Sequence, residues 1–297
     1  DINGIPTIKY TYYRDGTAPE GVRVSQKTSG TDTLDGYTFV DGLGRVVQTR
    51  MDAEDPSKQV VTDTFYNEIG KVEKQTIPYQ GSFSEEFTPG EYPRFYRYEY
   101  DPIGRVVRVY NPDPESPPKE ITYDHWKVLV EDENGHSKRY HMDAYDRIVK
   151  VEENNQGDVY DVYTTNYEYD ARDELTKITD TKGNEFSYQY DSLGRKINQN
   201  DPDMGYWTYT YDLNDNMISQ TDARGVTTNF QYDELNRILK RDNPHDPDIT
   251  YTYDQGTIGT LSSVTDATGT TQYNYDERLR TVGEGKTMDG RSWLMHW

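Results

Sequence analysis

The dipeptide Tyr-Asp recurs along this chain, and in the C-terminal half it recurs at a fixed interval. From Asp170 onward the aspartates lie 21, 21, 21, 21 and 22 residues apart. A short, constant period predicts an array built from one small supersecondary unit. The dipeptides are Tyr100-Asp101, Tyr123-Asp124, Tyr169-Asp170, Tyr190-Asp191, Tyr211-Asp212, Tyr232-Asp233, Tyr253-Asp254 and Tyr275-Asp276.

One unit is predicted to be two strands and two turns. Phe186, Tyr188 and Tyr190 occupy alternate positions, which is the period of a strand with one apolar face. The third residue after each aspartate is mostly Gly, Asp or Asn, so we expect a tight turn with a positive φ there. Thr257 and Leu279 depart from this rule. The second turn of the unit is Asp180–Gly183, Asp222–Gly225 or Asp266–Gly269, which suits a type I turn.

The predicted fold class is all-β. Antiparallel hairpin repeats of about 21 residues would form a continuous, coiling β-sheet strip, because no segment has helical periodicity over ten residues. More than half of the chain should be strand. We expect the same-face aromatic residues to form one continuous layer, in which Tyr209→Ala costs about 3–5 kcal/mol if the ring is buried. The layer would comprise Phe186, Tyr188, Tyr190, Trp207, Tyr209, Tyr211, Phe230, Tyr232, Tyr251 and Tyr253.

The regularity of the repeats divides the chain into three parts. Residues 1–36 are a divergent segment, residues 37–165 are irregular repeats with insertions at 80–92 and 111–119, and residues 166–297 are regular repeats. The last residues, 291–297, have the alternation of an entry strand without its turn. We therefore expect either more repeats beyond them or a contact with a neighbouring subunit.

Charge and composition exclude several classes of function. The formal net charge is −21, with 53 acidic and 32 basic residues, so phosphate-rich nucleic acid would be repelled and anionic membranes are disfavoured. No run of 18 apolar residues could span a bilayer. The absence of cysteine excludes disulfides, thiolate catalysis and cysteine metal sites.

Motifs that suggest chemistry are weak, and we predict no catalytic residue, cofactor or metal site. His136 and His141 have no clear third metal ligand. Gly285-Lys286-Thr287 lacks the first glycine and the strand–helix context of a phosphate-binding loop. Residues 212–216 start like a calcium loop but lack its glycine and glutamate. The aromatic rows could stack on sugars, although a structural ladder explains them more simply.

The framework of the repeats consists of the Tyr-Asp pair, the turn residue and the following arginine. We single out as structural repeat residues Tyr100, Asp101, Gly104, Arg105, Tyr169, Asp170, Tyr190, Asp191, Gly194, Arg195, Tyr211, Asp212, Tyr232, Asp233, Asn236, Arg237, Tyr253, Asp254, Tyr275 and Asp276.

The segments 100–107 (YDPIGRVV), 190–195 (YDSLGR) and 41–47 (DGLGRVV) resemble the YD repeat of the rearrangement hot spot (RHS) family. The resemblance covers about residues 37–297. Relatives of this family are the B and C components of Tc toxins, bacterial RHS polymorphic toxins and teneurins. The resemblance implies a long β-sheet strip that coils into a hollow shell and often encloses a C-terminal toxin.

These observations together favour a non-enzymatic structural segment of an RHS/YD-repeat casing that encloses or presents a C-terminal toxin or effector domain. The alternative is an extracellular adhesion or filament-forming protein that binds partners, glycans or copies of itself. The expected partners are the remainder of a longer chain and, through open sheet edges, further copies; nucleic acid and a membrane span are not expected. We expect a secreted or cell-surface location.

Overall fold

The computed structural model describes residues 7–296 except 15, 17, 18, 30, 31, 89, 91–93 and 155–161. Within that part of the chain it contains 26 strands and no helix, and every strand pairing is antiparallel. The predictions of an all-β fold and of a majority of strand residues are confirmed. The chain divides into two compact units, Asp1–Tyr163 and Thr164–Trp297.

The strands of the first unit pair mostly in sequence order from β1 to β13. The exception is β5, whose first half pairs with β7 and whose second half pairs with β6, while β6 pairs onward with β8. These strands are β1 (Ile8–Tyr13), β2 (Glu20–Ser29), β3 (Asp32–Val40), β4 (Val46–Asp52), β5 (Lys58–Tyr66), β6 (Val72–Thr76), β7 (Tyr79–Ser82), β8 (Phe95–Tyr100), β9 (Val106–Tyr110), β10 (Lys119–Asp124), β11 (Lys127–Glu131), β12 (Ser137–Met142) and β13 (Ile148–Asn154).

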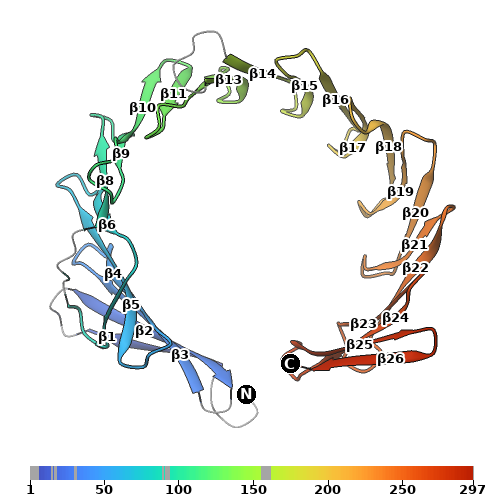
Figure 1. The fold of residues 1–297 in the computed structure, drawn as a ribbon, viewed down its shortest axis with the longest axis horizontal. Coiled ribbons are helices and arrows are strands. Elements are labelled where there is room, and N and C mark those ends of the chain that lie inside the picture. Colours follow the sequence, from blue (N-terminus) through green and yellow to red (C-terminus); the bar gives the residue numbers. More distant parts are fainter. Residues whose placement is uncertain are drawn as a thin grey trace. The chain divides into compact units, whose positions relative to one another are not determined.

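In the second unit each strand pairs with the next, so the strands follow one another in sequence order along the sheet (Figure 1). They are β14 (Val162–Tyr169), β15 (Leu175–Thr179), β16 (Glu185–Tyr190), β17 (Lys196–Asp201), β18 (Gly205–Tyr211), β19 (Met217–Thr221), β20 (Thr227–Tyr232), β21 (Ile238–Asn243), β22 (Asp246–Tyr253), β23 (Leu261–Asp266), β24 (Gly269–Tyr275), β25 (Thr281–Met288) and β26 (Arg291–His296).

The turns after the Tyr-Asp strands carry a β-bulge. In β16 the register with β17 shifts between Gln189 and Tyr190, so that Tyr190 lies opposite Lys196. The same shift precedes the turns after β18, β20, β22 and β24. A type I turn closed by one residue in the left-handed region produces this bulge and increases the local twist. The bulge therefore recurs at the same position in each of these repeats.

The second unit is a sheet of one layer. Its extensive contacts all run between strands that are neighbours in the chain. Apart from Gly283, the buried residues in its described part are polar: Gln199, Thr228, Thr260 and Thr271. Without a second layer, side chains on either face are covered only by their neighbours on the same face.

The prediction of one continuous aromatic layer is wrong, because the rings of successive aromatic strands do not contact one another. Each aromatic strand is separated from the next by a return strand, so Tyr188 lies opposite Gln199, and Gln199 lies opposite Trp207. The rings are consequently half-buried, Tyr209 among them. The expected cost of 3–5 kcal/mol for Tyr209→Ala assumed a buried ring and is too large for this position.

The first unit, in contrast, has a small core on one face of β2–β5. Tyr37, Phe39 and Val61 are its buried hydrophobic residues within the described chain. The predicted insertion near 80–92 covers them: Phe83 packs edge-on against Tyr37 at 6.5 Å, and Phe87 packs against Phe39 at 6.1 Å. The insertion thus supplies packing that the single-layer repeats lack.

A buried polar network fixes this insertion. The Arg50 guanidinium donates to Gln48 Oε1 (2.7 Å), Gln59 Oε1 (3.1 Å) and the carbonyl of Ser82 (3.2 Å). Gln48 Nε2 donates to Asp63 Oδ1 at 2.6 Å. Arg50, Gln48, Gln59 and Asp63 are all buried. Buried polar groups are tolerated when they are hydrogen-bonded in this way.

Candidate functional site: a clasp between successive repeats

The repeated turn is closed by its own aspartate. Asp191 Oδ1 accepts the backbone N–H groups of Leu193 (2.9 Å) and Arg195 (3.1 Å), and Asp191 Oδ2 accepts Arg195 Nε (2.7 Å). The backbone N–H of Gly194 donates to the carbonyl of Asp191, and that of Asp191 to the carbonyl of Arg195. One short acidic side chain therefore satisfies the polar groups that the tight turn leaves without strand partners.

The same arrangement recurs in both units. The Arg195 side chain lowers the pKa of the Asp191 carboxyl, and the Asn216 side chain does the same for Asp212. These carboxylates are acceptors in their own turns, so the turn motif keeps them ionised. Aspartates that accept from the second and the fourth following residue are Asp41, Asp101, Asp132, Asp143, Asp170, Asp180, Asp191, Asp212, Asp222, Asp233 and Asp276.

The predicted positive φ angles are confirmed. Gly104 has φ 84°, Gly194 has φ 81°, Asp215 has φ 67° and Asn236 has φ 61°. Leu279 stood outside the predicted residue pattern, yet its φ is 60°. The hydrogen bonds of the turn hold even a leucine in a conformation that normally favours Gly, Asn or Asp.

The turn at Asp254 is two residues longer than the others. Its backbone N–H donates to the carbonyl of Thr260 instead of to that of the fourth following residue. Gly259 takes the left-handed position with φ 86°, and its N–H donates to Asp254 Oδ1 at 2.6 Å. The insertion accounts for the departure at Thr257, because the glycine has moved with the longer loop.

In six of these strands the tyrosine before the turn reaches back to the preceding repeat. The hydroxyl of Tyr211 donates to the carbonyl of Lys196 at 2.8 Å, across 15 residues of chain. The same bond joins Tyr66 to Val46, Tyr100 to Val72, Tyr190 to Leu175, Tyr232 to Met217 and Tyr275 to Leu261, at 2.7–3.0 Å. The acceptor is in each case the residue that follows the preceding turn.

The arginine of the turn completes the contact. The Arg195 guanidinium lies 4.9 Å from the centre of the Tyr211 ring and donates to the Asp212 carbonyl (2.9 Å) and to Asp215 Oδ1 (3.0 Å). We call this set the inter-repeat clasp: the Asp, the Arg four residues later, and the Tyr of the next repeat. Arginine stacks in the same way in the pairs Arg45–Tyr66 (4.4 Å), Arg105–Tyr123 (4.1 Å) and Arg237–Tyr253 (4.4 Å).

Repeats without the arginine use substitutes. In the turn that begins at Asp170, the fourth position is Glu174, and burial together with Asp170 raises the pKa of that glutamate. Arg172 compensates by pairing with Glu174 at 2.7 Å and donating to the Asp191 carbonyl at 2.8 Å. Asn216 replaces arginine two repeats later and donates to Asn236 Oδ1 at 2.9 Å. Consecutive turns therefore stay linked although the side chains differ.

The structure places all of the predicted repeat residues at the ends of the Tyr-Asp strands and in the turns that follow. The hydrogen bond from the tyrosine hydroxyl was not predicted. Its acceptor is a backbone carbonyl, which every residue has, so residue type does not identify it. The recurrence of Arg four residues after Asp, at residues 45, 105, 147, 195, 237 and 280, was the available signal. That these residues are the structural framework of every repeat stays a prediction.

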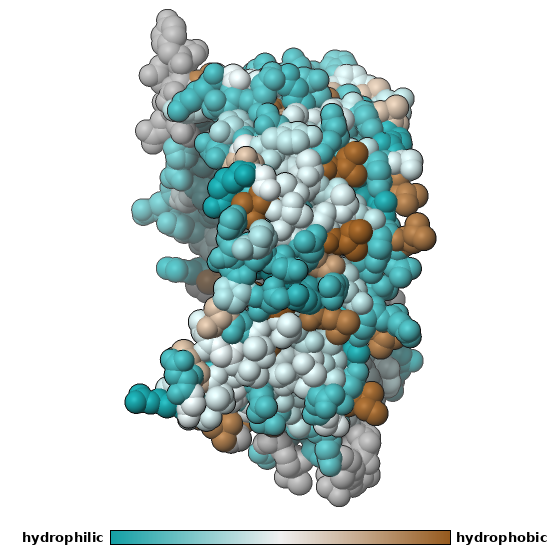
Figure 2. Space-filling view, turned by 90° about the vertical axis from the view of Figure 1, so that its right-hand side faces the viewer, coloured by the Kyte–Doolittle hydropathy of each residue, from teal (hydrophilic) through white to brown (hydrophobic). Residues whose placement is uncertain are grey.

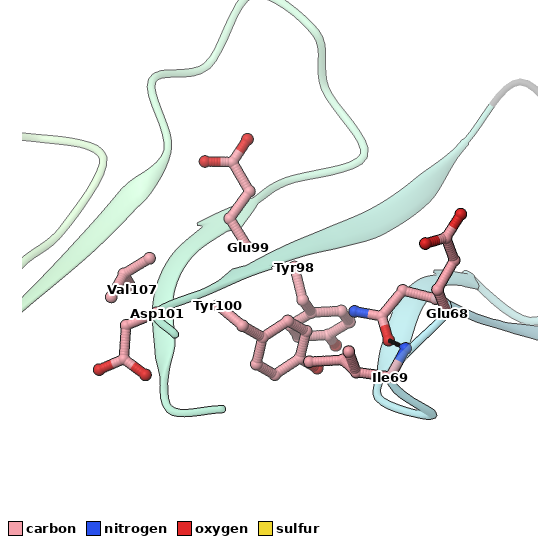
Figure 3. Close-up of a pocket in the computed structure, with 8 residues that line it drawn as sticks. Glu68, Ile69, Tyr98, Glu99, Tyr100, Asp101 and Val107 are labelled. Carbon is pink, nitrogen blue, oxygen red and sulfur yellow. Dashed lines mark hydrogen bonds between the residues drawn. The ribbon is translucent and has the colours of Figure 1, made fainter. Parts of the chain in front are cut away.

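A shallow hollow of about 560 Å³ lies beside the clasp in the first unit. Figure 3 shows the rings of Tyr98 and Tyr100 side by side, with the side chain of Ile69 pointing toward them. Glu68 and Glu99 point away from the rings (Figure 3). At the rim of the hollow, Asp101 Oδ2 accepts a hydrogen bond from Arg105 Nε at 2.7 Å. The hollow is the gap between two successive turns and has no converging set of free polar groups.

The weak motifs have ordinary partners in the structure. His136 lies 3.1 Å from Asp132, and His141 lies 3.0 Å from Glu152. Lys286, on β25, donates to Oγ1 of Thr268 in the turn between β23 and β24 at 2.6 Å. In the part of the chain that the structure describes, no three His, Cys, Asp or Glu side chains gather as metal ligands. That part also has no helix long and apolar enough to cross a membrane.

Known sequence families match parts of both units. The family described as RHS Repeat matches residues 169–205 and 211–246, which include the turns that begin at Asp170, Asp191, Asp212 and Asp233. A domain of unknown function, DUF6443, matches residues 13–99, which include the small core. No functionally curated protein shows significant sequence similarity to the chain.

Solved structures of Tc toxin proteins have the same fold. The crystal structure of TcdB2-TccC3 superposes with a TM-score of 0.77 at 16% identity, over 95% of this chain and 17% of that chain. The Photorhabdus luminescens Tc holotoxin pore with a mutant TccC3 gives 0.73 at 16% identity, over 91% of this chain and 16% of that one. The chain thus spans about a sixth of these proteins. The findings thus support RHS, or YD, repeats in residues 169–205 and 211–246, and the chain shares its fold with the Tc toxin proteins.

Proposed function

We propose that this chain is a non-enzymatic structural segment of an RHS/YD-repeat β-shell, part of a hollow casing that encloses or presents a C-terminal toxin or effector domain. The observation that carries the proposal is the inter-repeat clasp, which recurs at the turns of one edge and ties each repeat to the next. The fold likeness to Tc toxin proteins supports it.

The wall of a casing has to be thin and continuous, and neighbouring strands in it must not change register. The second unit is one layer thick, and its strands follow in unbroken order from β14 to β26. Slippage by one residue would move every side chain to the other face. In the observed register the ring of Tyr211 lies under Arg195 and its hydroxyl donates to the carbonyl of Lys196, so the clasp favours this register among repeated, similar strands.

The polar groups of the clasp also favour a structural role over catalysis. The aspartates are lowered in pKa by hydrogen bonds within their own turns, as for Asp191 and Asp233. A general base near neutral pH needs a raised pKa and access to a substrate proton. The repeated carboxylates have the opposite properties.

The alternative is an extracellular adhesion or filament-forming protein that binds partners, glycans or copies of itself. The half-buried aromatic rows and the exposed apolar residues on the turns favour it, because exposed apolar surface often marks an interaction site. Either role fits a secreted or cell-surface location.

The complete gene product distinguishes the two roles. We would express it, treat the folded protein with protease, and follow the region downstream of the repeats by mass spectrometry. A casing predicts that this region resists cleavage until the shell is unfolded with urea. Cleavage of the downstream region at the rate of an unprotected polypeptide, with the repeats intact, would contradict enclosure. A downstream region that consists only of further repeats would favour the filament.

A further inference from the structure

Among the repeated turns that the structure describes, the one that begins at Asp170 alone has an acidic residue, Glu174, at the fourth following position. Figure 2, which faces strands of the second unit, shows hydrophilic residues over much of the surface, so an acidic residue is not unusual there. Its position is unusual, because most of the other turns hold at this place the arginine that pairs with the aspartate. Six turns have that arginine, after Asp41, Asp101, Asp143, Asp191, Asp233 and Asp276.

The Glu174 carboxyl is enclosed by two successive turns. Its side chain is only 13% exposed, and its Oε2 atom lies 2.7 Å from Arg172 Nη2. Its Oε1 atom lies 3.0 Å from the place that a Cβ of Gly194 would occupy, so the carboxyl lies against the next turn. Arg172 Nη2 is also 3.6 Å from Asp170 Oδ2, so two carboxylates share one guanidinium group. Asp173 is the remaining charged residue of this turn.

The charged groups that face Glu174 come from its own turn and from the next. They are Asp170 and Arg172 on one side and Asp191 on the other, with the hydroxyl of Tyr190 on β16 nearby. Burial and the hydrogen bond with Asp170 raise the pKa of Glu174, and Asp191 acts in the same direction, while Arg172 opposes them. Burial opposes the lowering of the pKa of Asp170, but the backbone N–H groups of Glu174 and Arg172 donate to that carboxylate and outweigh it. A proton taken up by this pair therefore resides on Glu174.

We propose that the turn from Asp170 to Glu174 is a pH-dependent clasp, which holds the first hairpin of the second unit to the next repeat more firmly when Glu174 is protonated. The protonated carboxyl donates its O–H to Asp170, so one negative charge is removed and Arg172 is left to the remaining carboxylate. When Glu174 is ionised, two carboxylates compete for that guanidinium group, and Asp191 repels both. The clasp acts on the cohesion of the strip and does not depend on an enclosed domain.

The direction of the pH effect follows from the raised pKa of Glu174. A carboxyl group of this kind stabilises the fold fully below its unfolded value of 4.5, and the contribution is lost as the pH rises through the folded value. The arginine turns have the opposite dependence, because the pKa values of Asp191 and Asp233 are lowered. Raising the pH from 4.5 therefore loosens the Asp170 turn, whereas the arginine turns keep their contribution.

Hydrogen exchange followed by mass spectrometry locates the effect, once the intrinsic pH dependence of exchange is corrected for. In the wild-type chain, local opening of β15 should be about 2–5-fold more favourable at pH 7.5 than at pH 4.5, which is the size of one charge contact in a sheet. The amides of β21, which follows the arginine turn of Asp233, are the internal control and should show no such loosening. Equal protection of β15 at both pH values, or the same loosening in β21, would overturn the proposal.

Glu174→Gln separates the charge from the shape of the side chain. Because glutamine cannot ionise, the variant should abolish the pH dependence of β15 and protect this strand better than the wild type at pH 7.5. Glu234→Gln, an exposed position in an arginine turn, is the matched control and should leave the exchange of β15 as in the wild type. A Glu174→Gln chain whose β15 still loosens as the pH rises, or is less protected than the wild type at pH 7.5, would overturn the proposal.

Carbon-13 NMR of glutamate carboxyl groups tests the proton itself. The resonance of Glu174 is assigned by its loss in Glu174→Gln, and its titration midpoint in the wild-type chain should lie above 4.5. A midpoint at or below 4.5 would overturn the proposal, because the clasp would then carry both charges throughout the pH range tested.

Discussion

The hydroxyl of Tyr211 offers a direct measure of how strongly one repeat holds the next. It donates to the carbonyl of Lys196 at 2.8 Å, and Tyr211→Phe removes this bond while the ring stays under Arg195. A neutral hydrogen bond contributes a net of about 0.5–1.5 kcal/mol. We therefore expect Tyr211→Phe to lower the free energy of unfolding by about 1 kcal/mol.

Tyr209→Phe is the matched control, because Tyr209 lies on the same strand and face, two residues earlier. Among the described residues its hydroxyl makes no hydrogen bond, so the expected change is within about 0.5 kcal/mol. Tyr211→Ala, which also removes the half-buried ring and its contact with Arg195, should cost about 2–3 kcal/mol. Urea unfolding followed by circular dichroism measures all three. Equal midpoints for Tyr211→Phe and Tyr209→Phe would refute the clasp as a source of stability.

Three further predictions concern the turn, a charge pair and the small core. Gly194→Val forces a β-branched residue to φ 81° and should cost at least about 1–2 kcal/mol, whereas Ser192→Val should change stability by less than about 0.5 kcal/mol; equal urea midpoints would contradict the turn. Hydrogen bonding from Lys150 lowers the pKa of Glu152 from 4.5 to about 2, so its stabilising effect is present above pH 4.5 and is lost as pH falls toward 2; urea unfolding at pH 7 and pH 2.5 should show a smaller acid loss in Glu152→Gln. Arg50→Met leaves buried acceptors unpaired and should cost about 3–5 kcal/mol, and a loss below about 1 kcal/mol would mean that the network is solvated.

The local features of the fold could be predicted from the sequence because local chemistry determines them. Alternation in residues 186–190 defined a strand, and Asp191 with Gly194 defined a turn whose hydrogen bonds all lie within five residues. Leu279 shows the limit of residue type as a guide. Its φ of 60° follows from the hydrogen bonds of Asp276 to the turn, which override the preference of leucine.

The contacts between strands were harder to predict. The prediction of an aromatic layer was wrong because a return strand lies between successive aromatic strands in the antiparallel sheet. Gln199 therefore lies between Tyr188 and Trp207. The network of the first unit joins Arg50 to the Ser82 carbonyl, 32 residues away, across an insertion that breaks the repeat. No period connects such residues, so composition and spacing could not place them together.

The most direct measurement of the proposed role is an electron cryomicroscopy reconstruction of the complete gene product. We predict a hollow particle whose wall is a single β-layer, with strands β14–β26 forming part of that wall and the Tyr-Asp turns aligned along one edge of the strip. Density inside the particle would correspond to the enclosed domain. A solid particle, or an extended filament whose repeats enclose no volume, would contradict the casing and leave the adhesion or filament role in its place.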